Sequence, residues 1–100
     1  MSVLVIGKFQ GDTATFRQAL TDRSDEFVAI SDQARASGGI HHKFGIGDGF
    51  AMIVQEWESA EQFERFFANP ELQAFIGTVG AAAVPPEIEI VEAISSPDEF

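Results

Sequence analysis

Two segments of the chain, residues 3–6 and 51–54, are apolar at four successive positions. They lie within longer strand-like runs at residues 3–9 and 50–57, which contain several Val and Ile. A strand with one solvated face alternates apolar and polar side chains, whereas a continuous apolar run is typical of a strand covered on both faces. We therefore expect a sheet in which neither face of these two strands is open to water.

The segment between the first strand and Gly38 is predicted to be a long amphipathic helix. Asp12 or Thr13 can accept hydrogen bonds from the free N–H groups at its start. Its apolar positions recur at helical spacing: Phe16, Leu20, Phe27, Ile30 and Ala34. Arg23 interrupts this apolar stripe within residues 21–24, which favour caps and turns, so we expect a kink there.

A β-hairpin is predicted next. Residues 40–46 and 50–57 are strand-like, and Gly47-Asp48-Gly49 joins them. An Asp-Gly pair between two such runs is a strong hairpin signal. We therefore expect these two strands to be antiparallel neighbours.

Two consecutive helices follow the hairpin. Ser59 and Gln62 have the spacing of a capping box, in which the serine hydroxyl accepts from the Gln62 N–H and the glutamine reaches back. Asn69 and Pro70 end this helix and begin another, because Asn caps helices and Pro is tolerated at the first helical position. A last strand is predicted at residues 87–94. The tail ends at Phe100, which we expect to dock on its own chain or on a partner subunit.

The order of these elements is β-α-β-β-α-β, the ferredoxin-like arrangement of a four-stranded antiparallel sheet with helices on one face. One α+β domain accounts for residues 1–100. The second face of the sheet must also be covered, and no residues remain to cover it. We therefore expect a homodimer in which two copies pack sheet on sheet.

Composition excludes several classes of function. Sixteen acidic and six basic residues give a formal net charge of −10 at pH 7. This charge repels phosphate backbones and anionic headgroups, so we expect no nucleic acid and no membrane as partners. The absence of cysteine excludes thiolate nucleophiles, iron–sulfur clusters and zinc ribbons. The first residues lack a basic segment before a long apolar run, so we expect a cytoplasmic protein.

A longer pattern runs from the hairpin into the two helices after it. It contains Glu56-Trp57 at the strand end, Ser59-x-x-x-Phe63-x-x-Phe66 in the first helix and Asn69-Pro70-Glu71-Leu72 at the junction. In these residues the chain resembles the dimeric α+β barrel superfamily, in particular its small members related to antibiotic biosynthesis monooxygenases. The resemblance covers nearly the whole chain and implies a dimeric α+β barrel of two ferredoxin-like protomers.

The resemblance also implies a monooxygenase-like function. Haem-degrading members carry an iron-binding histidine where this chain has Ile76, so we expect no haem and no other cofactor. Quinone-forming members combine Asn, Trp and Tyr around an aromatic substrate. Trp57 matches their tryptophan, but Ile53 stands at the position of their asparagine and the chain contains no Tyr.

His41 and His42 are the candidate catalytic residues, because only histidine titrates near neutral pH without help from its surroundings. Consecutive strand residues point to opposite faces, so the two cannot bind one metal ion within a subunit, and we expect no metal. One should face the helices and the other the barrel lumen. We favour His42 as the base or substrate anchor and keep His41 as the alternate, because Phe44 and Ile46 share the face of His42 and would form an apolar pocket.

The candidate substrate-binding residues are Trp57, Phe44, Phe66 and Arg23. The flat face of Trp57 can stack on an aromatic substrate. Arg23 could bind a carboxylate or phenolate. Each also has a purely structural interpretation, as a core aromatic or as the residue at a helix kink.

Two functions follow from these residues. In the first, a small hydrophobic or aromatic molecule lies between sheet and helices and is oxidised without a cofactor, with a histidine as proton acceptor. In the alternative, the same dimer is a non-enzymatic small-molecule binder or a structural module, and both histidines are structural. The number of polar groups that converge on one pocket separates the two functions.

Overall fold

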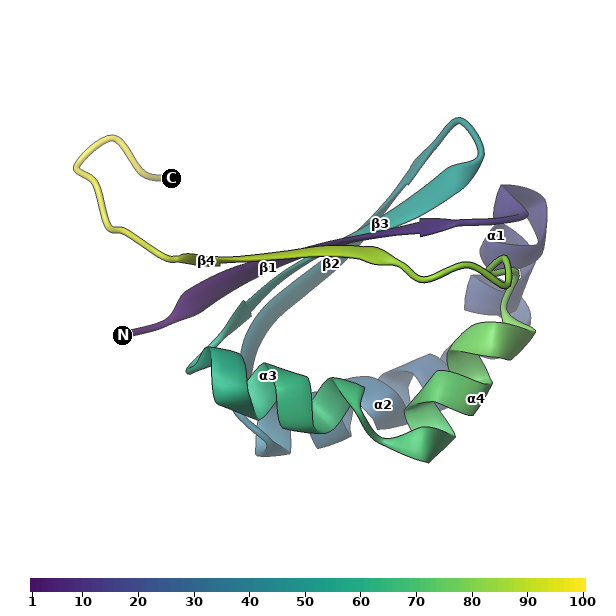
Figure 1. Ribbon diagram of the computed structural model, residues 1–100, viewed down its shortest axis with the longest axis horizontal. Coiled ribbons are helices and arrows are strands. Elements are labelled where there is room, and N and C mark those ends of the chain that lie inside the picture. Colours follow the sequence, from purple (N-terminus) through teal and green to yellow (C-terminus); the bar gives the residue numbers. More distant parts are fainter.

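A computed structural model describes all of residues 1–100. The elements are β1 (Val3–Gln10), α1 (Thr13–Asp22), α2 (Ser24–Ala36), β2 (Gly39–Gly47), β3 (Phe50–Trp57), α3 (Ala60–Phe67), α4 (Pro70–Thr78) and β4 (Glu87–Glu92). The strands form one sheet in the order β2-β3-β1-β4, and all neighbouring strands are antiparallel. All four helices lie on one face of this sheet (Figure 1). The ferredoxin-like α+β fold predicted from the sequence is confirmed.

The predicted kink is a complete break between α1 and α2 at Arg23. The Arg23 N–H donates to the Ala19 carbonyl at the end of α1, and its own carbonyl accepts from the Phe27 N–H in the first turn of α2. The guanidinium forms two hydrogen bonds of 2.8 Å with Glu26 and one of 2.7 Å with the Thr78 hydroxyl. Arg23 therefore joins the α1–α2 junction to the end of α4.

The helix starts at Ser59 and Asn69 are confirmed, but one detail of the capping box is wrong. The Ser59 hydroxyl accepts from the Gln62 N–H at 3.2 Å, as expected. The Gln62 side chain, however, accepts from the same hydroxyl and donates to Glu58. It lies against Gly38, whose backbone has a φ of 118° and where a Cβ atom would approach the Gln62 amide to 2.7 Å. The close packing on Gly38 thus positions this side chain.

The last strand is shorter than predicted, because β4 ends at Glu92. The Ala93 N–H still donates to the Ser2 carbonyl at 3.0 Å. Beyond it the tail turns away from the helices (Figure 1). Ile94 and Phe100 are almost completely exposed, so the expectation that Phe100 docks on its own chain is wrong.

The core consists of two separate clusters on the helix-covered face. Only eight residues of the chain are buried, too few for one continuous core. The first cluster contains Val5, Trp57 and Phe63. The second contains Phe16, Ala19 and Val79 and adjoins Ala51, at the opposite end of β3 from Trp57. The space between the two clusters is the site described below.

The face of the sheet opposite the helices has an apolar centre and polar edges. The pairing register places five apolar side chains of the central strands there: Phe50 near the hairpin turn and four at the middle of the sheet, which we call the outer stripe, Leu4, Ile6, Met52 and Val54. On the same face the edge strands carry Lys43 in β2 and Glu87 and Glu89 in β4. The expectation of two apolar faces thus holds for the middle of β1 and β3, whereas Lys8 in β1 and Glu56 in β3 are charged residues on the same outer face. None of the helices has the length and apolar character needed to cross a membrane.

Candidate functional site

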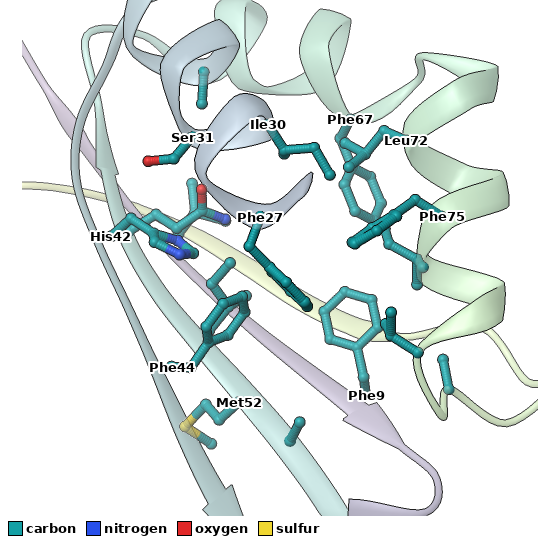
Figure 2. A pocket seen from close by; sticks show the side chains of 18 of the residues that line it. Phe9, Phe27, Ile30, Ser31, His42, Phe44, Met52, Phe67, Leu72 and Phe75 are labelled. Carbon is teal, nitrogen blue, oxygen red and sulfur yellow. The ribbon is translucent and has the colours of Figure 1, made fainter. Parts of the chain in front are cut away.

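A cavity of about 330 Å³ lies between the sheet and the helices. This volume is near the lower end of the range of about 300–1,000 Å³ that is typical of small-molecule sites. Most of the lining residues are apolar, and they come from all four strands and all four helices. Figure 2 shows the side chains of α2 and α4 pointing across this space toward the sheet.

Five phenylalanine rings line the cavity, two from the sheet and three from the helices, and we call them the phenylalanine wall: Phe9, Phe44, Phe27, Phe67 and Phe75. Phe27 is its centre, with ring centroids 5.0 Å from Phe75 and 5.9 Å from Phe44, both edge to face. Edge-to-face contacts of this kind fix the orientation of rings. The wall therefore offers a rigid apolar surface that suits a flat aromatic molecule.

Three of the polar residues that line the cavity come from α2, β2 and β3, and we call them the polar corner: Ser31, His42 and Gln55. The lining also contains Gln10, Asp12, Thr13, Arg35 and His41. Figure 2 shows Ser31 and His42 on the same side of the cavity, away from Phe67 and Phe75. His42 and Gln55 are directly paired across β2 and β3. Side chains of directly paired residues have Cβ atoms about 4.5–5.5 Å apart, so both can contact one ligand group.

His42 faces the helices and the cavity at the same time. It shares this face with Phe44, whose ring lies edge to face at 4.5 Å and also lines the cavity, whereas Ile46, the other residue expected around it, packs against the second core cluster. The hollow lies between sheet and helices, where the enzyme hypothesis places the substrate, and His42 is the histidine on that face of the sheet. His42 keeps an exposed surface, but its partial burial against the cavity lowers its pKa below the ordinary value of 6.5. At pH 7 the ring is therefore mostly neutral and can accept a proton.

His41 belongs to the opposite face. Its partner in the register is Glu56, whose carboxylate accepts a hydrogen bond of 2.6 Å from the Ser2 hydroxyl. Although His41 and the outer-stripe residue Met52 are both at the cavity boundary (Figure 2 labels Met52), the register and the strand alternation assign both to the outer face. The two histidines are thus separated by the sheet, as the sequence predicts.

Trp57 and Phe66 both line the cavity. Trp57 is 1% exposed, with ring centroids 5.3 Å from Phe66 and 5.7 Å from Phe63. Its indole N–H donates a hydrogen bond of 3.0 Å to the Gln55 side-chain oxygen. Only part of the Trp57 surface is therefore available to a ligand, and much of the side chain is core.

Arg23 is not brought to the cavity. Its guanidinium lies 4.5 Å from the Phe75 ring, on the side that also holds Glu26 and Thr78. The ion pair with Glu26 raises the pKa of Arg23 and lowers the pKa of Glu26. The structure thus places four of the candidate residues, His42, Phe44, Trp57 and Phe66, around one space and leaves Arg23 outside it.

Sequence reasoning missed Gln55 and Ser31. Gln55 is the only polar residue among the helix-facing positions of β3, which are Ala51, Ile53, Gln55 and Trp57. Ser31 lies four residues after Phe27 and so belongs to the cavity-facing side of α2. A polar residue at an otherwise apolar position was the available signal in both cases.

Comparison with solved structures gives clear matches in fold. The monooxygenase ActVA-Orf6 of Streptomyces coelicolor, in complex with nanaomycin D, has a TM-score of 0.71 and 15% identity, with 99% of this chain and 93% of that chain covered. SnoaB of Streptomyces nogalater, a cofactor-independent oxygenase, has a TM-score of 0.60 and 15% identity, with 98% of each chain covered. A dimeric ferredoxin-like protein from an uncultured marine organism has a TM-score of 0.66 and 11% identity, with 99% and 93% covered.

No protein-family model matches the chain, and a comparison with curated proteins gives no match. The solved structures nevertheless confirm the resemblance that the sequence pattern suggests, at the level of fold. The chain has the ferredoxin-like fold of the antibiotic biosynthesis monooxygenase-like proteins. Sequence identities this low support a shared fold and do not support a shared activity.

Proposed function

We propose that this chain binds a small aromatic molecule in the cavity and oxidises it with molecular oxygen, without a cofactor. The observation that carries the proposal is a phenylalanine-lined cavity of about 330 Å³ that holds a neutral histidine among its few polar groups. The similarity of fold to SnoaB, a cofactor-independent oxygenase, and to ActVA-Orf6 with bound nanaomycin D supports it.

The chemistry needs a base and an electron-rich ring. In this reaction His42 accepts the proton of a phenolic hydroxyl, and the resulting phenolate transfers electrons from its ring to O₂. One oxygen atom becomes the new carbonyl oxygen of a quinone, and the other leaves as water with the two hydrogen atoms that the ring compound has lost. The phenylalanine wall excludes water and holds the ring, while the chain supplies no redox group.

We also propose that the active form is a homodimer. The outer stripe leaves four apolar side chains at the centre of a sheet face that no helix covers, and Val54 is 47% exposed. A second copy of the same face would remove them from water. The dimeric ferredoxin-like protein of the same fold supports this arrangement.

A non-enzymatic binder is the second candidate, and one observation favours it. The polar corner contains a single ordinary base, and Arg23, the predicted anion-binding residue, lies outside the cavity. Three polar groups are enough to orient a ligand without performing chemistry on it. The two candidates share the site and differ in whether O₂ is consumed.

Oxygen uptake with 1-naphthol separates the two candidates. Oxidation at its free para position forms 1,4-naphthoquinone and water from one O₂. We expect uptake by the wild type that falls by about 10²-fold or more in His42→Ala, the usual range for loss of a general base. His41→Ala is the matched control on the other face and should keep the rate. Saturable binding without oxygen uptake would support the binder, and an equal loss in both variants would contradict the role of His42.

A further inference from the structure

Gln55 is held in one orientation by Trp57. The indole N–H can only donate, so the atom at 3.0 Å from it must be the amide oxygen of Gln55. Trp57 itself is fixed, because it is 1% exposed and packed with Val5 and Phe63. The amide NH₂ group of Gln55 is therefore directed away from the indole.

The NH₂ group of Gln55 has no hydrogen-bond partner in the chain, because the hydrogen bond with Trp57 uses only the amide oxygen. No side-chain polar atom is both buried and unpaired, so this nitrogen is not fully buried. Gln55 lines the cavity, where apolar groups predominate. A donor in such a place favours a ligand that brings its own acceptor, because that ligand restores the hydrogen bond lost with water.

An acceptor lies next to this donor. His42 is the direct cross-strand partner of Gln55, and burial lowers its pKa, so the neutral ring offers a lone pair at pH 7. A phenolic hydroxyl can donate and accept at once, whereas an unsubstituted aromatic ring can do neither. The pair therefore matches a hydroxyl group on a ring that rests against the phenylalanine wall.

We propose that Gln55 is a specificity-determining residue, which donates from its side-chain nitrogen to the ligand oxygen whose hydrogen is directed at His42. The cavity accordingly selects phenols over aromatic hydrocarbons of the same shape. This inference rests on the proposed function, since it assigns the residue of that same cavity that recognises the phenolic hydroxyl. Trp57 is the positioning residue that keeps the Gln55 nitrogen toward the ligand.

The test compares 1-naphthol with naphthalene, measured anaerobically so that no turnover occurs. Affinities for the wild type, Gln55→Met and Gln55→Glu are determined by fluorescence titration at pH 8, with thermal melts as the check on folding. Met removes both hydrogen-bonding atoms at similar length, whereas Glu still accepts from Trp57 but has lost the donor. We expect the preference for 1-naphthol over naphthalene to fall about five- to tenfold in both variants, as the loss of one hydrogen bond requires.

A spectroscopic measurement separates two roles of Gln55: donation of a hydrogen bond to the ligand, and acceptance of the hydrogen bond from Trp57. A donor at the oxygen stabilises naphtholate, so bound 1-naphthol should ionise at lower pH in the wild type than in Gln55→Met. If Gln55→Glu and Gln55→Met keep the wild-type preference and the wild-type ionisation, the inference is overturned while binding in the cavity stands. If the wild type binds neither compound, the proposed function itself fails.

Discussion

The two faces of the sheet are built from the same two central strands and have opposite characters. The face under the helices holds both core clusters, the cavity and the polar corner. The other face carries the outer stripe, with no helix over it (Figure 1). Apolar side chains on one face line a cavity, while those on the other form a flat surface that lies against its own copy in the proposed dimer. Under the proposed function, alternation along β1 and β3 separates ligand binding from assembly.

A charged substitution on the outer face should have the largest effect, and the affected property is the oligomeric state. We expect Val54→Asp to convert the dimer into a monomer at micromolar concentration, because it would place a charge at the centre of the interface. Val28→Asp is the matched control, since Val28 is 59% exposed on α2 and Val54 47% exposed on β3. Light scattering measures both. A Val54→Asp protein that remains a dimer would contradict the sheet-on-sheet arrangement.

Breaking the helix-covered face should reduce stability rather than assembly. Trp57→Ala removes the largest fully buried side chain and should lower the free energy of unfolding by about 3–5 kcal/mol. Met52→Ala changes a residue of the outer stripe on the same strand. In a monomeric variant it should lower the free energy of unfolding less than Trp57→Ala does. Denaturant titrations in the Val54→Asp background make this comparison. Equal losses would mean that the two faces contribute alike to the fold.

The lowered pKa of His42 predicts a smaller, pH-dependent effect. Well above pH 6.5 the ring is neutral in both folded and unfolded chains and contributes nothing to the pH dependence of stability. As pH falls below 6.5, the unfolded chain takes up a proton that the folded chain resists, so the free energy of unfolding decreases. His42→Asn should lose this decrease, whereas His41→Asn should keep it. A wild-type profile identical to that of His42→Asn would show that burial does not affect this ring.

The tail should give the smallest effect. Because Phe100 is fully exposed in the single chain, docking on a partner subunit is the remaining form of the original prediction. Deleting residues 97–100 should then lower the melting temperature of the dimer and leave that of monomeric Val54→Asp unchanged. An unchanged melt of the dimer would mean that the tail packs on nothing.

The fold could be predicted because its signals are local. Ser59 and Asn69 cap helices through their own neighbours, and Arg23 marks a break by interrupting an apolar stripe. The cavity could be predicted only in part. That His42 and Phe44 share a face follows from alternation, but which face is hollow depends on how α2 and α4 pack across the sheet.

The polar corner could not be predicted from local sequence signals, because its residues are far apart in the chain. Ser31 lines the cavity from α2. The hydrogen bond from Trp57 orients Gln55, and the pairing of β2 with β3 places His42 beside it. Arg23 shows the converse. A local sequence signal indicated an available cation, whereas Glu26 and Thr78 occupy its guanidinium in the folded chain.

The two histidines provide the most direct test of the central claim, that the helix-covered face binds an aromatic hydroxyl compound at the polar corner. They are adjacent in sequence, are the only histidines, and lie on opposite faces of the sheet. Their ring resonances can be followed by NMR while 1-naphthol is added anaerobically. We predict that the His42 signals shift and saturate with one ligand per chain while those of His41 stay in place. Unchanged His42 signals, or a shift of His41 alone, would contradict the account.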